Sequence, residues 1–162
     1  MTNLKAKDIM SKHVVWITED MSVDNAMSLF IEEMISGAPV VDDDGNMTGV
    51  VSMRDFLKNG SLKTGFSADR EEAIFYNESW ELPISREEAS SFHLETGKDL
   101  KVSEVMTPIV FNADVETPVE ELAETMLKGR IHRMVILDGD ELAGLVTTMD
   151  MLKVICHSNA EV

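Results

Sequence analysis

A hydroxyl residue and an aspartate three positions later occur together twice in this sequence. The first pair is Ser52 with Asp55, and the second is Thr147 with Asp150. A hydroxyl at a strand end, followed by a helix start, lies among backbone N–H groups that lack helical partners, an arrangement that suits an anion or a ribose. The aspartate can accept two hydrogen bonds from a vicinal diol such as the ribose 2′,3′-hydroxyls, and bonds to a charged acceptor are strong. The alternative is that each pair only caps a helix, which these residue types do well.

Each pair lies inside a longer segment that the chain repeats. "GVVSMRDFLK" at 49–58 and "GLVTTMDMLK" at 144–153 share a Gly, two apolar residues, the hydroxyl residue, the Asp and a final Lys. The match extends upstream, where "DIMSKHV" from Asp8 pairs with "EVMTPIV" from Glu104, and "APVVDDDG" from Ala38 pairs with "MVILDGD" from Met134. We therefore predict two repeats, at 4–58 and 101–155, separated by an insert at 59–100.

The pattern inside each repeat predicts the order β-α-β-β-α, and hence an α+β fold. Apolar segments at 14–17 and 110–112 indicate first strands, and apolar residues at helical spacing follow them, from Val23 to Met34 and from Val119 to Met126. Two apolar runs divided by an Asp/Gly turn then indicate a hairpin, at 39–41 with 47–52 and at 134–137 with 142–147. Final helices are expected at 53–58 and 148–155. Ser22 is the expected helix cap in repeat one, and Thr117 opens a capping-box pattern in repeat two.

The composition argues against several classes of function. The 162 residues include 30 acidic and 14 basic side chains, a formal net charge of −16, which disfavours nucleic acid and anionic membranes as partners. The one cysteine, Cys156, cannot form an intramolecular disulfide and fits a reducing compartment. No signal-peptide pattern and no apolar run of ~20 residues appears, so we expect a cytoplasmic protein. We expect neither a bound metal nor an enzyme, because no zinc-like spacing, nucleophile-base pair or glycine-rich phosphate loop appears.

The repeated pattern resembles a tandem pair of CBS domains, the module named after cystathionine β-synthase. The resemblance is carried by "DIM" and "EVMT" at the repeat starts, by "APVVDDDG" and "RMVILDGD" before the turns, and by the two Gly-apolar-apolar-Ser/Thr-x-x-Asp segments. It implies two pseudo-symmetric repeats packed as one module, with AMP, ADP, ATP or S-adenosylmethionine in the cleft between them and no further cofactor. It also implies a homodimer that senses energy state or metabolites and signals by conformational change to another protein. The alternative is a structural dimerisation or protein-interaction module without a nucleotide.

The resemblance also implies where each adenosine lies, between the Asp of one repeat and the first strand of the other. Around Asp150 and Thr147 we therefore expect Ser11, Val15 and Ile35. Around Asp55 and Ser52 we expect the equivalent set, Thr107, Phe111 and Ile131.

A pair of cationic residues distinguishes the two repeats. His132 and Arg133 stand where CBS modules that sense adenine nucleotides have a His-Arg pair that reaches the phosphates, and Ser36 and Gly37 are the aligned residues of repeat one. A guanidinium suits phosphate, although both cations could instead only neutralise nearby acids. We expect the Asp150 site to be the better one.

The insert holds five of the nine aromatic residues of the chain. Such a segment should bury surface, and helices are expected near 69–77 and 86–96. Packing on its own module or on a partner subunit, a lid and a docking face for another protein all remain open.

Overall fold

The computed structural model describes residues 3–59, 100–108 and 111–158. The helices expected near 69–77 and 86–96 lie outside these residues. The chain forms two compact units, one of residues Val15–Ile109 and one of residues Met1–Val14 with Val110–Val162. Each unit combines helices with a small mixed sheet, which confirms the expected fold class.

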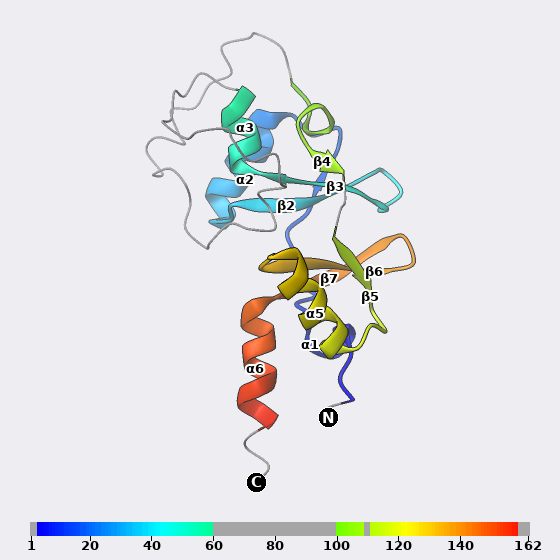
Figure 1. The fold of residues 1–162 in the computed structure, drawn as a ribbon. Helices are drawn as coiled ribbons and strands as arrows, with labels where there is room; N and C mark the ends of the chain where they lie inside the picture. The colour runs from blue at the N-terminus through cyan, green and yellow to red at the C-terminus, as the bar shows by residue number, and fades with distance from the viewer. Residues whose placement is uncertain (1–2, 60–99, 109–110, 159–162) are drawn as a thin grey trace. The chain divides into compact units, whose positions relative to one another are not determined.

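The unit that contains Asp55 has a four-stranded sheet in the order β1-β2-β3-β4 (Figure 1). Its strands are β1 (Ile17–Thr18), β2 (Gly37–Val41), β3 (Met47–Ser52) and β4 (Thr107–Pro108). β1 runs parallel to β2, and the other neighbours are antiparallel. Its helices are α2 (Val23–Glu33), α3 (Met53–Asn59) and the short 3-10 helix η2 (Val102–Glu104). The predicted hairpin and final helix are thus present in repeat one.

The core of this unit lies between its sheet and the helices α2 and α3. The rings of Phe30 on α2 and Phe56 on α3 meet with centroids 5.3 Å apart, and both are fully buried with Val51 of β3. The helical spacing of apolar residues was therefore a good guide to the buried face of α2. It was wrong for Met34, which is 70% exposed, because the helix ends before it and Met34 adopts a left-handed conformation as the C-cap.

The unit that contains Asp150 has a three-stranded sheet in the order β5-β6-β7. Its strands are β5 (Asn112–Asp114), β6 (Arg133–Asp138) and β7 (Glu141–Thr147), and its helices are α1 (Ala6–Ile9), α5 (Val119–Gly129) and α6 (Thr148–Ser158). β5 runs parallel to β6, and β6 forms the antiparallel hairpin with β7. The first strands of both repeats begin later than predicted, at Ile17 and Asn112 instead of 14 and 110.

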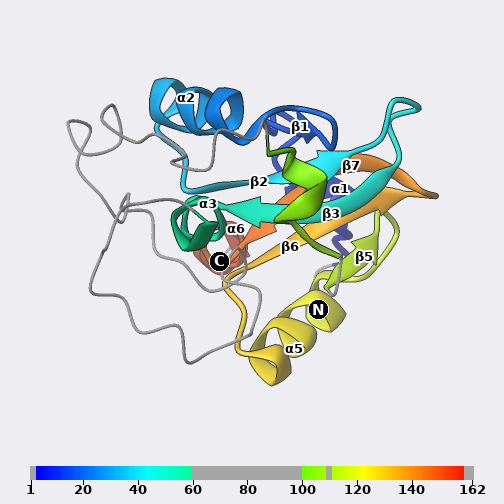
Figure 2. The same cartoon turned by 90° about the horizontal axis from the view of Figure 1, so that it is seen from above.

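The opening segment of each repeat packs in the compact unit of the other repeat. We call these segments leader 1 (residues 4–11) and leader 2 (residues 100–108). Leader 1, dark blue in Figures 1 and 2, pairs with the C-terminal repeat through bridges from Lys5 to Pro118 and from Ser11 to Leu145. Leader 2 pairs with the N-terminal repeat through β4 and through a bridge from Lys101 to Ser22. The repeats therefore exchange their leaders.

The leaders also complete the starts of the helices α2 and α5. The N–H of Val23 donates to the carbonyl of Leu100 at 2.8 Å, and the N–H of Val119 donates to the carbonyl of Leu4 at 3.0 Å. Ser22 caps α2 as predicted, since its hydroxyl accepts from the N–H of Asn25 at 3.3 Å. The capping box expected at Thr117 was wrong, because Pro118 is the N-cap of α5 and no side chain bonds to that end.

Candidate functional site

The carboxylate of Asp150 lies at the junction between β7 and α6. Thr147, the last residue of β7, donates to its Oδ2 from the backbone N–H at 2.9 Å and from the hydroxyl at 2.7 Å. Lys153, one turn along α6, donates to Oδ1 from Nζ at 2.9 Å. Asp150 is only 8% exposed. The helix-capping interaction is therefore present, and a further donor occupies the second oxygen.

Burial and hydrogen bonding act on Asp150 in opposite directions. Burial raises the pKa of its carboxyl, but the hydrogen bonds from Lys153 and from the side chain and backbone of Thr147 outweigh this effect. The net result is a pKa below the ordinary value of 3.8. Asp150 is thus ionised at neutral pH and can only accept hydrogen bonds.

Repeat one builds the same junction between β3 and α3. Ser52 donates to Oδ2 of Asp55 from its backbone N–H and from its hydroxyl, both at 2.8 Å. Ser52 is completely buried, whereas Asp55 is half-buried. The two hydroxyl-aspartate pairs found in the sequence are therefore equivalent in local geometry.

The first backbone amide of each following helix already has a partner. The N–H of Thr148 donates to the carbonyl of His132 at 3.0 Å, and the N–H of Met53 donates to the carbonyl of Ser36 at 2.8 Å. The expectation of unpartnered amides at these junctions does not hold for these two groups. These two amides are therefore not available to an anion.

Arg133 is a residue by which the two junctions differ. In the hairpin of β6 and β7, Arg133 stands directly opposite Thr147, and residues directly opposite in such a pair project from the same face with Cβ atoms ~5 Å apart. In the hairpin of β2 and β3, Gly37 stands opposite Ser52. At the position that faces the hydroxyl residue across the hairpin, repeat two thus has a guanidinium where repeat one has glycine.

The remaining expected site residues divide between the two compact units. Ser11 is in the unit of Asp150, where its backbone exchanges hydrogen bonds with Leu145 at 2.9 and 3.0 Å. Thr107 is in the unit of Asp55 and pairs with Val50. These two residues thus share a unit with the aspartate to which each was assigned.

The four apolar residues belong to the other unit in each case. Val15 and Ile35, expected around Asp150, are half-buried in the unit of Asp55. Phe111 and Ile131, expected around Asp55, are in the unit of Asp150, where Ile131 is 4% exposed. The ring of Phe111 is so close to Gly129 that a Cβ atom there would lie 3.1 Å from ring carbon Cε1.

The glycine that begins each repeated segment is explained by the leaders. A Cβ atom on Gly144 would lie 2.8 Å from the carbonyl oxygen of Ser11 and 2.7 Å from Sδ of Met10. On Gly49 it would lie 2.7 Å from the carbonyl oxygen of Thr107 and 2.9 Å from Sδ of Met106. Glycine within a strand commonly marks such a close backbone approach.

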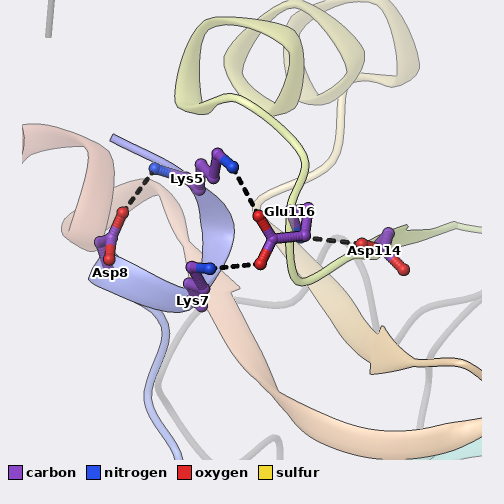
Figure 3. Close-up of polar contacts among 5 residues, drawn as sticks. All are labelled: Lys5, Lys7, Asp8, Asp114 and Glu116. Carbon is purple, nitrogen blue, oxygen red and sulfur yellow. Dashed lines mark hydrogen bonds and ion pairs between the residues drawn. The ribbon is translucent and has the colours of Figure 1, made fainter. Parts of the chain in front are cut away.

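Leader 1 is also fixed by a small charged cluster, drawn in Figure 3. Lys5 and Lys7 both donate from Nζ to the carboxylate of Glu116, in the turn between β5 and α5. The N–H of Glu116 donates to Asp114 at 2.8 Å, and the N–H of Lys5 donates to Asp8 at 2.9 Å. The hydrogen bonds from the two lysines lower the pKa of Glu116 from 4.5 to about 2.

Lys153 is the residue that the sequence reasoning missed at this site. The signal was present, because both copies of the repeated segment end in Lys, three positions after the Asp. In the parts of the chain that the structure describes, no group of three or more His, Cys, Asp or Glu side chains could hold a metal ion. The same residues include no helix long and apolar enough to cross a membrane.

Comparisons with solved structures reveal close similarity in fold. The CBS domain of a CBS domain-containing membrane protein from Sphaerobacter thermophilus is 31% identical, with a TM-score of 0.66 over 93% of this chain and 87% of that chain. CBSX2 from Arabidopsis thaliana in complex with AMP is 22% identical, with a TM-score of 0.66 over 96% and 98%. The CBS domain pair of protein MJ0100, in complex with 5′-methylthioadenosine and S-adenosyl-L-methionine, is 22% identical, with a TM-score of 0.62 over 97% and 99%. The two similarities at 22% identity support the fold.

Comparisons of sequence agree with this result. An uncharacterized protein of Methanocaldococcus jannaschii is 29% identical over 91% of this chain and 88% of its own length. The chain spans 27% and 58% of the next two curated relatives. The family model for the CBS domain matches twice, at residues 6–61 and 102–157, which together make up more than half of the chain. The chain therefore belongs to the CBS domain family, with two copies of the domain in tandem.

Proposed function

We propose that this chain is a regulatory module that binds an adenosine-containing ligand at Asp150 and signals the bound state to another protein. AMP, ADP, ATP and S-adenosylmethionine are the candidate ligands. Two of the similar solved structures support this class, since one holds AMP and the other holds 5′-methylthioadenosine and S-adenosyl-L-methionine.

The observation that supports this function best is the position of Arg133 opposite Thr147 in the register of β6 and β7. Thr147 in turn bonds to Asp150. A carboxylate for ribose, a hydroxyl and a guanidinium for phosphate thus come from neighbouring positions. Asp55 has Ser52 but has glycine in place of the guanidinium, so we propose Asp150 as the preferred site.

The other expected contacts form part of the same proposal. His132 is exposed beside Arg133 and adds a second group for phosphate. Ser11 belongs to the same unit as Asp150, and Val15 and Ile35 are the apolar residues assigned to the adenine by resemblance to the family. We further propose that the module is not an enzyme, acts in the cytoplasm and senses energy state or a metabolite.

A second function, self-association without a nucleotide, is supported by the surface of α6. Met149, Leu152 and Ile155 on this helix are 45%, 53% and 57% exposed. Asp150, the only acidic residue of α6, is buried. A helix with exposed apolar side chains and no exposed acid is suited to contact a second copy of a chain whose formal charge is −16.

A thermal-unfolding screen against AMP, ADP, ATP, S-adenosylmethionine and NAD tests the first function. A ligand at about 100 times its dissociation constant adds about 2.7 kcal/mol, or about 5–10 °C for a domain of this size. We expect one compound to raise Tm by this amount in the wild type and not in Asp150→Ala. Asp55→Ala removes the equivalent carboxylate of repeat one and should lower the shift less. If no compound raises Tm at millimolar concentration, self-association is the better account.

A further inference from the structure

The two oxygens of the Asp150 carboxylate have different partners. Oδ2 accepts both hydrogen bonds from Thr147, whereas Oδ1 accepts from Nζ of Lys153 at 2.9 Å. The side chain of Asp150 is 11% exposed and that of Lys153 is 67% exposed. The carboxylate is therefore held in place by the protein, while the ammonium reaches it from the solvent side.

A ribose bound at Asp150 requires the oxygen that Lys153 contacts. Each carboxylate oxygen has about two lone-pair sites, and the two donors of Thr147 use both sites of Oδ2. The vicinal hydroxyls of a ribose must therefore both donate to Oδ1, where Lys153 already uses one site. Both hydroxyls can bind only when the ammonium moves away.

We propose that Lys153 is a built-in competitor of ribose for Asp150, and that it sets the affinity of this site for nucleosides. The inference rests on the proposed function, because it assumes that adenosine binds at Asp150. Lys153 is suited to this role because its side chain is mostly exposed, so the ammonium can turn into the solvent when a ligand replaces it. It does not need to touch the ligand, since it acts through Asp150.

Calorimetric titration of the full chain with adenosine tests this inference, because adenosine carries the ribose diol but no phosphate. Lys153→Met keeps an unbranched apolar stem and removes the ammonium, and we expect it to bind adenosine roughly threefold to fivefold more tightly than the wild type. Lys153→Arg keeps a cation beside Asp150 and should restore the wild-type affinity. Added salt should increase the affinity of the wild type, because it screens the ion pair, and leave that of Lys153→Met unchanged.

Two controls isolate the competition for Oδ1. Lys128→Met removes a lysine of the same unit that pairs with Glu124 on α5, and it should bind adenosine like the wild type. 2′,3′-Dideoxyadenosine lacks the hydroxyls that need Oδ1, so the wild type and Lys153→Met should bind it equally. An equal gain with both nucleosides would overturn the inference.

The remaining outcomes separate the inference from the proposed function. If the wild type binds adenosine and Lys153→Met binds it equally or more weakly, Lys153 is not a competitor, while the proposed site stands. If neither protein binds adenosine at millimolar concentration, the inference fails, because ribose does not compete at Asp150, and the thermal-unfolding screen decides separately whether the proposed function stands. If Lys153→Met binds adenosine and the wild type does not, the result supports the inference, because removal of the ammonium then makes binding possible.

Discussion

Gly144 lies against the backbone of Ser11, whose carbonyl oxygen a Cβ atom on Gly144 would approach to 2.8 Å. The two hydrogen bonds between Ser11 and Leu145, at 2.9 and 3.0 Å, hold leader 1 at this distance. Gly49 has the same relationship to Thr107 in the other unit. The glycine of the repeated segment is thus required because the leader passes close to it. The hydroxyl residue and the aspartate that follow make none of these close contacts.

We expect Gly144→Ala to lower the free energy of unfolding by about 1–3 kcal/mol, because the new methyl group forces the leader away from β7. Urea denaturation followed by circular dichroism measures this change. Adding Met10→Ala removes the contact at 2.7 Å with Sδ but leaves the Ser11 carbonyl in place. The double variant should therefore recover only part of the loss, and an unchanged midpoint in Gly144→Ala would contradict this account.

Glu116→Gln should loosen leader 1, because it removes the charge that both Lys5 and Lys7 contact. Amide hydrogen exchange at Ala6 and Lys7, whose N–H groups donate to the carbonyls of Thr117 and Val115, should become faster. Glu120→Gln removes an equal charge nearby on α5 and is the matched control. Exchange at these two amides that does not differ between the variants would show that the cluster does not hold the leader.

The same cluster has a defined pH dependence. The pKa of Glu116 is lowered from 4.5 to about 2 in the folded protein, so its contribution to stability is present above pH ~4.5 and is lost as the pH falls through about 2. The difference in hydrogen exchange between the wild type and Glu116→Gln should follow this window and disappear at its acid end.

Met34→Gly should raise the free energy of unfolding by about 0.5–1 kcal/mol. Met34 ends α2 with φ 54° and ψ 42°, a left-handed conformation that costs an L-residue roughly 1–2 kcal/mol and glycine very little. Part of this gain is offset because glycine adds freedom to the unfolded chain. Thermal unfolding measures the change, and Glu33→Gly, one residue earlier inside the helix, should instead lower stability by about 1 kcal/mol. A loss of stability in both variants would refute the assignment of strain to Met34.

Local signals in the sequence predicted the elements whose determinants are local. The hairpin of repeat one begins its second strand at Met47 and ends it at Ser52, as predicted, because an Asp/Gly turn fixes where the strand can start. Ser22 caps α2 with its own side chain. These features depend on neighbours in sequence, so they can be predicted from a single sequence.

Apart from Met34 and the starts of the first strands, the errors occur where the partner is distant in sequence. Thr117 has the composition of a helix cap, but the N–H of Val119 is satisfied by the carbonyl of Leu4 and the carbonyl of Thr117 accepts from Ala6. The residue pattern by itself did not indicate the exchange of leaders, because the two repeats read as contiguous units, although the family resemblance placed Ser11 with Asp150 and Thr107 with Asp55. At the site, the pairs of hydroxyl and aspartate were found, whereas the role of Lys153 required the geometry of both carboxylate oxygens.

The exchange of leaders has a consequence for the synthesis of the chain on the ribosome. Lys5 and its partner Glu116 are 111 residues apart, and at typical rates of translation Lys5 is made on the order of 5–20 s before Glu116. Most of the N-terminal repeat is made during this interval, but leader 2 is made only just before Glu116, and leader 1 waits for β5, β6 and β7. Ala6, which is completely buried in the finished protein, stays exposed to water until the C-terminal repeat is made.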